Sequence, residues 1–293
     1  MDKLFKRAFT LIELLVVIAI IGILSGLIVV TMNGVTEKAN IAKAQVFSNS
    51  LRNALMMNLV SEWKFDGVTT ERAATNADAV DTWSRAGNGT IPASPAIPTV
   101  KVSSDCVNES CLSFDGNDYV STSLKPTSKG TIAAWFYLQS GSSSMIVGSQ
   151  MATPDSRAYL GINSAFNLGG GIGTSTYNTI KTTETVPFQK WHYGALTWDG
   201  TNVRIYLNGK GYSFPQSGSV PDYALYIGTN NYSGGLGNYW TGRLDDVRFF
   251  DAAMPASQIK EQYYAGLNDL LANDSILNEE YLERVSSLAV AEK

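Results

Sequence analysis

The sequence begins with a short basic segment that runs directly into a long apolar one. Residues 1–8 carry three basic side chains, and residues 9–30 contain a single charged residue, Glu13. About twenty apolar residues in a helix, at ~1.5 Å rise each, cross the ~30 Å hydrocarbon layer of a membrane. Because basic flanks stay on the cytoplasmic side, we expect one pass through the cytoplasmic membrane, with the N-terminus inside and the rest of the chain outside.

The order of these segments differs from that of an ordinary secretory signal, in which a small-residue cleavage site follows the apolar run. Here the small residue, Ala8, precedes the run FTLIE at residues 9–13, which continues apolar to Leu24. The stretch resembles the prepilin signature of type IV pilins and type II secretion pseudopilins. This resemblance implies that a prepilin peptidase cuts between Ala8 and Phe9 and methylates the new amine. Ala8 departs from the Gly that usually precedes the cut.

Glu13 is an acid inside the apolar run. A carboxylate at that depth is costly unless it is paired, and the amine created at Phe9 of a neighbouring subunit is the partner we expect. In the alternative, Glu13 extends to the headgroup layer. Gly22 and Gly26 form a G-x-x-x-G pair, which permits close approach of helices. We therefore predict that Glu13, Gly22 and Gly26 serve the assembly of identical or related subunits into a helical filament.

A helical pattern continues beyond the apolar run. Apolar residues recur at helical spacing from Val35 to Leu59, which predicts a long helix over residues 9–59 with its membrane span at 9–30. Residues 1–8 would be the leader peptide removed from this helix.

From residue 60 onward the pattern changes to short runs of alternating residues between Gly, Asn and Asp turns, which is typical of an antiparallel β-sandwich. Asn208-Gly209 predicts a hairpin after the run 203–207, because both residues accept positive φ. We assign residues 60–266 to the sandwich. The amphipathic stretch 267–293 predicts a helical tail whose packing partner stays open.

Several segments of the second part follow one another in a recognisable order. Together they resemble the concanavalin A-like, laminin G-like jelly-roll lectin domain, and they comprise residues 111–120, 131–136, 191–200, 203–209 and 242–250. The expected fold class is therefore α+β: a long N-terminal transmembrane helix, then a jelly-roll sandwich, then C-terminal helices.

Charge and residue content argue against two functional classes, nucleic-acid binding and catalysis. With a net charge of −4 and a pI near 5.1, the chain has no electrostatic basis for binding nucleic acid. Glycosidases of this sandwich carry paired acids along one strand, and no strand here has that pattern. His192 is the only histidine, so a catalytic triad is disfavoured. We expect no enzyme activity and no catalytic residues.

The two cysteines, Cys106 and Cys111, lie in a Ser/Asp/Asn-rich stretch. A disulfide is favoured because the segment is expected outside the cytoplasm. Two thiols alone are too few for a zinc site.

Asp245 is the residue that most suggests a metal. It falls in phase with Val247 and Phe249, which should face the core, so its carboxylate must be either paired or metal-bound. In the lectin-like family the first and last strands lie side by side, which brings Asp66 and the Asn88 loop near Asp245. Carboxylate and carbonyl oxygens suit Ca²⁺, so the sequence predicts a structural calcium site, with a purely hydrogen-bonded Asp245 as the alternative.

A sugar site needs aromatic side chains at the surface. Tyr232, Tyr239 and Trp240 lie in or beside a Gly/Asn/Ser-rich segment and are our candidates for stacking on sugar rings. The alternative for each is packing in the core.

These features predict a pilin-like filament subunit that passes from the cytoplasmic membrane to the cell surface. Its lectin-like head would serve adhesion or recognition of a glycan or surface polymer. An alternative is a type II secretion pseudopilin whose head binds exported protein, and a third is a membrane-tethered enzyme acting on polysaccharide.

Overall fold

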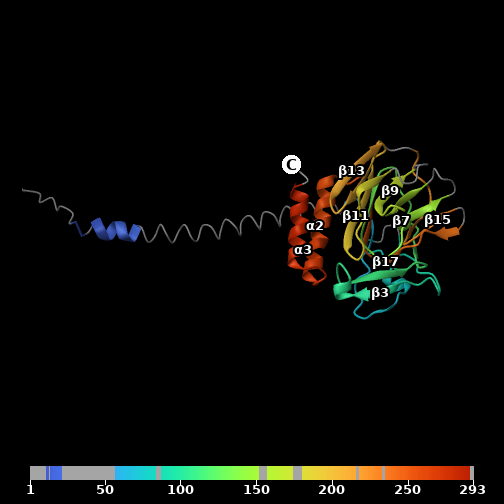
Figure 1. The fold of residues 1–293 in the computed structure, drawn as a ribbon, viewed down its shortest axis with the longest axis horizontal. Coiled ribbons are helices and arrows are strands. Elements are labelled where there is room, and N and C mark those ends of the chain that lie inside the picture. The colour runs from blue at the N-terminus through green and yellow to red at the C-terminus, as the bar shows by residue number, and fades with distance from the viewer. Residues whose placement is uncertain are drawn as a thin grey trace, which may run out of the picture. The chain divides into compact units, whose positions relative to one another are not determined.

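The computed structural model describes residues 11–12, 14–21, 57–83, 87–151, 157–173, 180–215, 218–232 and 235–290. The chain divides into two units, Met1–Met56 and Met57–Lys293, and each is treated by itself (Figure 1). We call the second unit the head.

Only ten residues of the first unit are described, and all of them are helical. Their large apolar side chains are exposed, as at Leu11 and Ile21. Within the described residues, no helix is long and apolar enough to cross a membrane. Five predicted functional residues lie outside the described part, so their roles stay predictions: Ala8, Phe9, Glu13, Gly22 and Gly26.

The head is a sandwich of two antiparallel sheets, as expected (Figure 1). In spatial order, the first sheet contains β13 (Lys210–Pro215), β12 (Asn202–Leu207), β11 (Trp191–Trp198), β6 (Gly130–Leu138), β17 (Thr241–Phe250), β4 (Ser110–Asp115), β3 (Thr99–Val102) and β2 (Arg72–Ala73). Strand β1 (Leu59–Trp63) also pairs with β17. Short 3₁₀ turns occur at Asn76–Asp78 and Ser103–Asp105.

The second sheet contains β10 (Lys181–Thr185), β9 (Asn167–Ile172), β8 (Ala158–Ile162), β7 (Ser144–Met151), β14 (Leu225–Ile227) and β5 (Val120–Ser121). A short hairpin of β15 (Asn230–Tyr232) and β16 (Gly235–Gly237) is attached to it through a parallel pairing of β15 with β7. The predicted Asn208-Gly209 hairpin is confirmed: it joins β12 to β13, and both residues have positive φ.

The core lies between the two sheets. In β6, Ile132, Ala134 and Phe136 face the core, and the alternate residues face the other side of the sheet. Three of those alternate residues, Thr131, Ala133 and Trp135, are fully buried as well. The central strands are therefore buried on both faces, which a two-layer sandwich alone does not require.

Two C-terminal helices cover this outer face (Figure 1). Helix α2 (Ala256–Ala272) places Tyr263 on Trp135, with ring centroids 5.7 Å apart and nearly parallel planes. Helix α3 (Asn278–Val290) is held by Arg284, whose guanidinium donates to the Trp191 carbonyl at 2.8 Å. The tail thus packs on the head, and α2 runs without a break across the domain boundary that we placed at residue 266.

Candidate functional site

Asp245 occupies an irregular point of β17. It is fully buried, and it pairs across the sheet with Trp135, so both lie on the outer face beneath the helices. The register with β6 shifts between Asp245 and Arg248, and Asp246 has φ +48°. This β-bulge interrupts the alternation of the strand. Asp245 therefore does not share the core face of Val247, as the sequence pattern had indicated.

Backbone amides surround the Asp245 carboxylate. Its Oδ2 accepts from the amides of Val107 at 2.9 Å and Asn108 at 3.3 Å, and its Oδ1 accepts from the amide of Asp246 at 2.8 Å. These three donors satisfy both oxygens of a fully buried group. The contacts match the hydrogen-bonded alternative for Asp245.

The amides of Val107 and Asn108 belong to a loop that is closed by the predicted disulfide. Cys106 and Cys111 are joined. The carbonyls of Val107 and Asn108 accept from the Asn273 side chain at 3.1 and 2.9 Å. One short loop therefore donates to Asp245 through its N–H groups and binds the end of α2 through its C=O groups.

Like charges gather beside this loop. Burial, and then the neighbouring Asp246 and Glu109, raise the pKa of Asp66 to about 6. The pKa of Asp245 is raised well above its usual value by burial first, and then by Asp246 and Asp66. Arg248 supplies the opposing charge, with contacts of 3.1 Å to Asp246 and 2.7 Å to Glu62. The structure thus brings Asp66 and Asp245 together, as the family arrangement implied.

Asn88, the third predicted calcium ligand, makes a different contact. Its Oδ1 accepts from the amide of Asp81 at 3.1 Å, and the Oδ1 of Asp81 accepts from the amide of Glu62 at 3.0 Å. Within the described ranges, no group of three or more His, Cys, Asp or Glu side chains is placed to hold a metal ion.

The predicted aromatic residues have separate environments. Trp240 is fully buried and meets Phe136 edge-on at 5.8 Å, so it belongs to the core and offers no surface to a ligand. Tyr239 is half-buried. The side chain of Tyr232 lies outside the described part, although its backbone belongs to β15.

Two further tyrosines meet one another on the second sheet, and the sequence pattern had not indicated them as candidates. Tyr119 and Tyr226 meet at 6.2 Å in an edge-on arrangement. One signal was available: Tyr226 stands between Leu225 and Ile227, which are buried, so alternation directs it outward.

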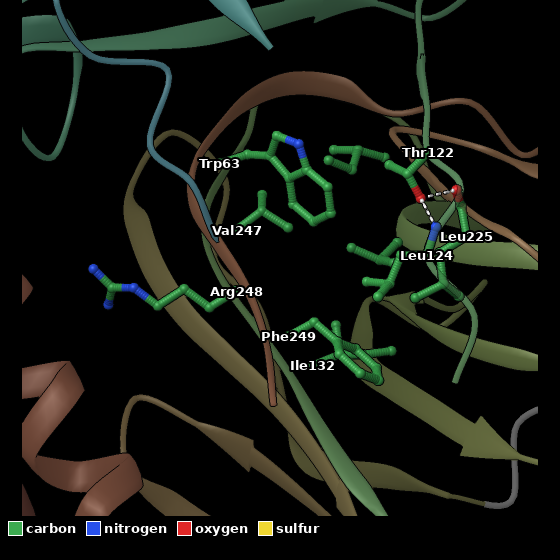
Figure 2. A pocket seen from close by; sticks show the side chains of 10 residues that line it. Trp63, Thr122, Leu124, Ile132, Leu225, Val247, Arg248 and Phe249 are labelled. Atoms are coloured by element: carbon green, nitrogen blue, oxygen red, sulfur yellow. Dashed lines mark hydrogen bonds between the residues drawn. The ribbon is translucent and has the colours of Figure 1, made fainter. Parts of the chain in front are cut away.

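A small void lies between the sheets, and Figure 2 shows Trp63, Ile132 and Phe249 around it. Its volume is about 10 Å³, near the lower limit for one water molecule. The Thr122 hydroxyl donates to the Leu225 carbonyl at its border, at 2.7 Å. Arg248 extends away from it (Figure 2). The void is a packing defect and not a ligand pocket.

His192 has a structural environment. One ring nitrogen lies 3.1 Å from the Pro187 carbonyl, and the other lies 3.0 Å from the Asn208 side-chain amide. Burial, together with the nearby Arg284 charge, lowers its pKa to about 4. This buried, neutral imidazole anchors the Asn208-Gly209 hairpin.

Comparison with protein families identifies both parts of the chain. A model of the concanavalin A-like lectin/glucanases superfamily matches residues 114–260, which is half of the 293-residue chain. The chain therefore belongs to this superfamily. A model of the prokaryotic N-terminal methylation motif matches residues 5–29, which confirms the predicted prepilin signature.

Solved structures of similar fold include two toxin domains. The binding domain of Paraclostridial Mosquitocidal Protein 1 matches with 13% identity and a TM-score of 0.53, over 73% of this chain and 53% of that chain. The botulinum neurotoxin serotype D ligand binding domain, in complex with N-acetylneuraminic acid, matches with 13% identity and a TM-score of 0.52, over 74% and 53%. The chain thus spans about half of each toxin domain.

Domain 4 of AbnA, an extracellular arabinanase from Geobacillus stearothermophilus, in complex with arabinotriose, matches with 16% identity and a TM-score of 0.48, over 70% of this chain and 97% of that chain. At these identities the toxin matches show the fold alone. Comparison with curated proteins found no match.

Proposed function

We propose that this protein is a type IV pilin-like filament subunit whose head serves adhesion or glycan recognition. The observation that carries the proposal is the union, in one chain, of an N-terminal methylation motif at residues 5–29 and a lectin-like sandwich. The motif supports membrane insertion, cleavage after Ala8 and packing through the N-terminal helix. The sandwich then becomes the part that a filament presents outside the cell.

Binding rather than catalysis is the proposed role of the head. The family is one of lectins and glucanases, and a neurotoxin domain of the same fold has been solved with N-acetylneuraminic acid. Within the described residues, His192 is committed to structural contacts. The acids around Asp245 are bound to backbone amides and Arg248, which supports a structural role for them.

The test combines processing and assembly. Mass spectrometry of the mature protein should show a chain that begins with N-methylated Phe9. Glu13→Ala should remove most filaments while the chain still reaches the membrane, because the Phe9 amine of the neighbour loses its partner. Glu13→Asp, which keeps the charge, is the matched control and should retain more filaments. Filaments of normal abundance from Glu13→Ala would refute the role of Glu13.

The same cells distinguish the proposed filament subunit from the alternative, a type II secretion pseudopilin. A secretion pseudopilin would form only short filaments under native expression, and its head would retain exported protein rather than glycan. Crosslinking of the head in intact cells, followed by identification of the captured species, distinguishes these outcomes.

We also propose to test the calcium site predicted at Asp66, Asn88 and Asp245. Burial, and after it the neighbouring acids, raises the pKa values of Asp66 and Asp245, and a cation beside them would stabilise their charged forms. Thermal unfolding of the head is followed as calcium is added to millimolar concentration. A rise in Tm supports the site, and an unchanged Tm ends the proposal.

A further inference from the structure

Three tyrosines from distant parts of the sequence converge at the outer side of the second sheet. Tyr119 precedes β5, Tyr226 lies in β14, and Tyr239 precedes β17. Strands β14 and β5 are paired, and the amide of Trp240 donates to the Gly228 carbonyl at 2.8 Å, which brings Tyr239 to the end of β14. We call Tyr119, Tyr226 and Tyr239 the tyrosine cluster.

The rings of the tyrosine cluster lie near one another. Tyr119 and Tyr226 have centroids 6.2 Å apart and planes inclined by 64°. Tyr119 and Tyr239 both flank Gly228, because a Cβ at Gly228 would lie 3.4 Å from the Asp118 carbonyl and the Trp240 amide donates to the Gly228 carbonyl at 2.8 Å. Two of the three rings are therefore in contact, and the third lies beside the same end of β14.

Their chain neighbours show which way these rings point. Val120, Leu225, Ile227 and Trp240 are all buried, and three of these adjoin the tyrosines within strands β5 and β14. Because adjacent residues of an extended chain point to opposite sides, the tyrosines face outward. Each of the three is half-buried, so part of every ring is open to solvent.

Tyr226 is flanked by short side chains on the neighbouring strands, while the Thr229–Asn230 segment crosses the same face at Gly148, where a Cβ would lie 2.7 Å from the Asn230 Cβ. Its two cross-strand partners are Ser121 on β5 and Gly148 on β7, and partners in register share a face of the sheet. One of these has a short side chain and the other has none. Neither covers the Tyr226 ring.

The supporting backbone is rigid. Gly228 has φ +84°, and a Cβ there would lie 2.6 Å from the Phe114 ring, so no other residue fits this approach. Before Tyr119, the Asp118 carboxylate accepts from the Asp115 amide at 2.8 Å and closes the turn. A preorganised surface loses little conformational entropy when it binds.

We propose that the tyrosine cluster is a binding platform for a neutral glycan. This inference rests on the proposed function of the head. Ring faces pack against the C–H faces of a pyranose, while phenol hydroxyls bond to sugar hydroxyls, so tyrosine suits a ligand that is apolar on one side and polar on the other. Asn238, exposed and next to Tyr239, adds a carboxamide at the edge.

Charge selects for a neutral sugar. The ionisable groups nearest in sequence to Tyr119 are Asp115 and Asp118, and both are acids. Within the described part of the chain, the cation–π contacts involve Tyr137 and Tyr212 and none of the tyrosine cluster. Asp118 is buried, so an anionic sugar would meet the exposed Asp115, while Lys125, beside the start of β14, is already paired with Asp222 at 3.0 Å.

The cluster also differs from a protein-docking surface. The large apolar side chains exposed in the described residues lie elsewhere, for example Met57, Phe188 and Leu277. Cores of protein interfaces combine their tyrosines with large apolar side chains, and among the described residues no exposed side chain of that kind adjoins the tyrosine cluster in sequence. These observations favour a sugar as the occupant.

The test uses the full chain in detergent micelles, applied to an array of neutral oligosaccharides and their sialylated counterparts. We expect binding to neutral members, and about tenfold or greater loss of affinity from Tyr226→Ala and from Tyr119→Ala. Tyr226→Phe keeps the ring and should retain most of the affinity. Tyr281→Ala is the matched control, because Tyr281 is a half-buried tyrosine of α3 that bonds Asn268.

The outcomes separate this inference from the proposed function. If the wild-type chain binds neutral glycans and both alanine variants bind equally well, the platform is wrong while glycan recognition stands. Binding to sialylated members alone overturns the neutral specificity. If the wild-type chain binds no glycan, both fail. Binding is compared only among variants whose Tm equals that of the wild type. A Tyr226→Phe chain that folds normally but loses all binding also contradicts ring stacking.

Discussion

Gly266→Ala tests the packing of α2 on the first sheet. A Cβ at this position would lie 2.3 Å from Nε1 and 2.5 Å from Cε2 of Trp135, well inside ordinary contact distance. Trp135 is fully buried and has Tyr263 at 5.7 Å and Tyr193 at 5.4 Å. The indole therefore has no free space to move into, and either the helix or the ring must shift.

The expected magnitude follows from two opposing effects. Overpacking of a core costs about 1–3 kcal/mol, while replacing a helical glycine with alanine recovers up to ~1 kcal/mol. Because the overlap at 2.3 Å is severe, we take the upper end of the overpacking cost and expect a net loss of about 2 kcal/mol in the free energy of unfolding. In a domain of this size ~1 kcal/mol lowers Tm by about 2–4 °C, so Gly266→Ala should melt several degrees below the wild type.

The assay is thermal unfolding of the head, followed by near-ultraviolet circular dichroism. Gly237→Ala is the matched control, because a Cβ there would meet nothing within 4 Å, and its Tm should stay near the wild-type value. Trp135→Phe removes part of the obstructing ring, so adding it to Gly266→Ala should cost less than the two separate effects together. A Gly266→Ala head at least as stable as the wild type would refute the packing described for α2.

Two further predictions concern the loop at Asp245. Replacing Cys106 and Cys111 with serine should cost about 2 kcal/mol, the value for so short a closed loop; reductant should then lower the Tm of the wild type but not of this variant. Burial raises the pKa of Asp66 to about 6, whereas the pKa of an Asp in the unfolded chain is ~3.9. The protonated Asp66 therefore stabilises the head fully below pH ~3.9, and this contribution is lost as the pH rises through about 6. Asp66→Asn should therefore stabilise the head at pH 7, by roughly 1–3 kcal/mol, and change little at pH 4.

Each of these has a contrary result. A serine double variant that keeps the wild-type Tm would show that the disulfide does not hold the loop. Loss of stability from Asp66→Asn at pH 7 would show that the charged Asp66 carboxylate does not destabilise the head. Such a loss seen only with calcium present would point to the metal site instead.

Local patterns predicted much of the head. Alternation placed strands at residues 131–136 and 203–207, where β6 and β12 are found. Asn208-Gly209 formed the expected hairpin because two consecutive residues accept positive φ. The expected placement of Cys106 and Cys111 outside the cytoplasm favoured their disulfide, which the structure contains. In each case the determining interaction lies within a few residues.

The predicted orientations of Asp245 and Trp240 were wrong, because contacts with residues distant in the sequence determine them. The bulge at Asp246 moves Asp245 to the outer face, and alternation gives no sign of an inserted residue. An aromatic residue beside a polar loop suits a ligand site as well as a core, and only the packing of Trp240 on Phe136 distinguishes them. The tyrosine cluster forms because β14 pairs with β5. The spacing of residues along the chain does not predict which strands pair.

The central claim is that a pilin-type N-terminus carries this head onto a surface filament. Electron microscopy of cells labelled with an antibody against the head tests it most directly. We expect label along the filaments of the wild type and loss of that label from the surface in Glu13→Ala, with the chain retained in the membrane. Filaments that never carry the label, or labelled filaments of normal abundance in Glu13→Ala, would contradict it.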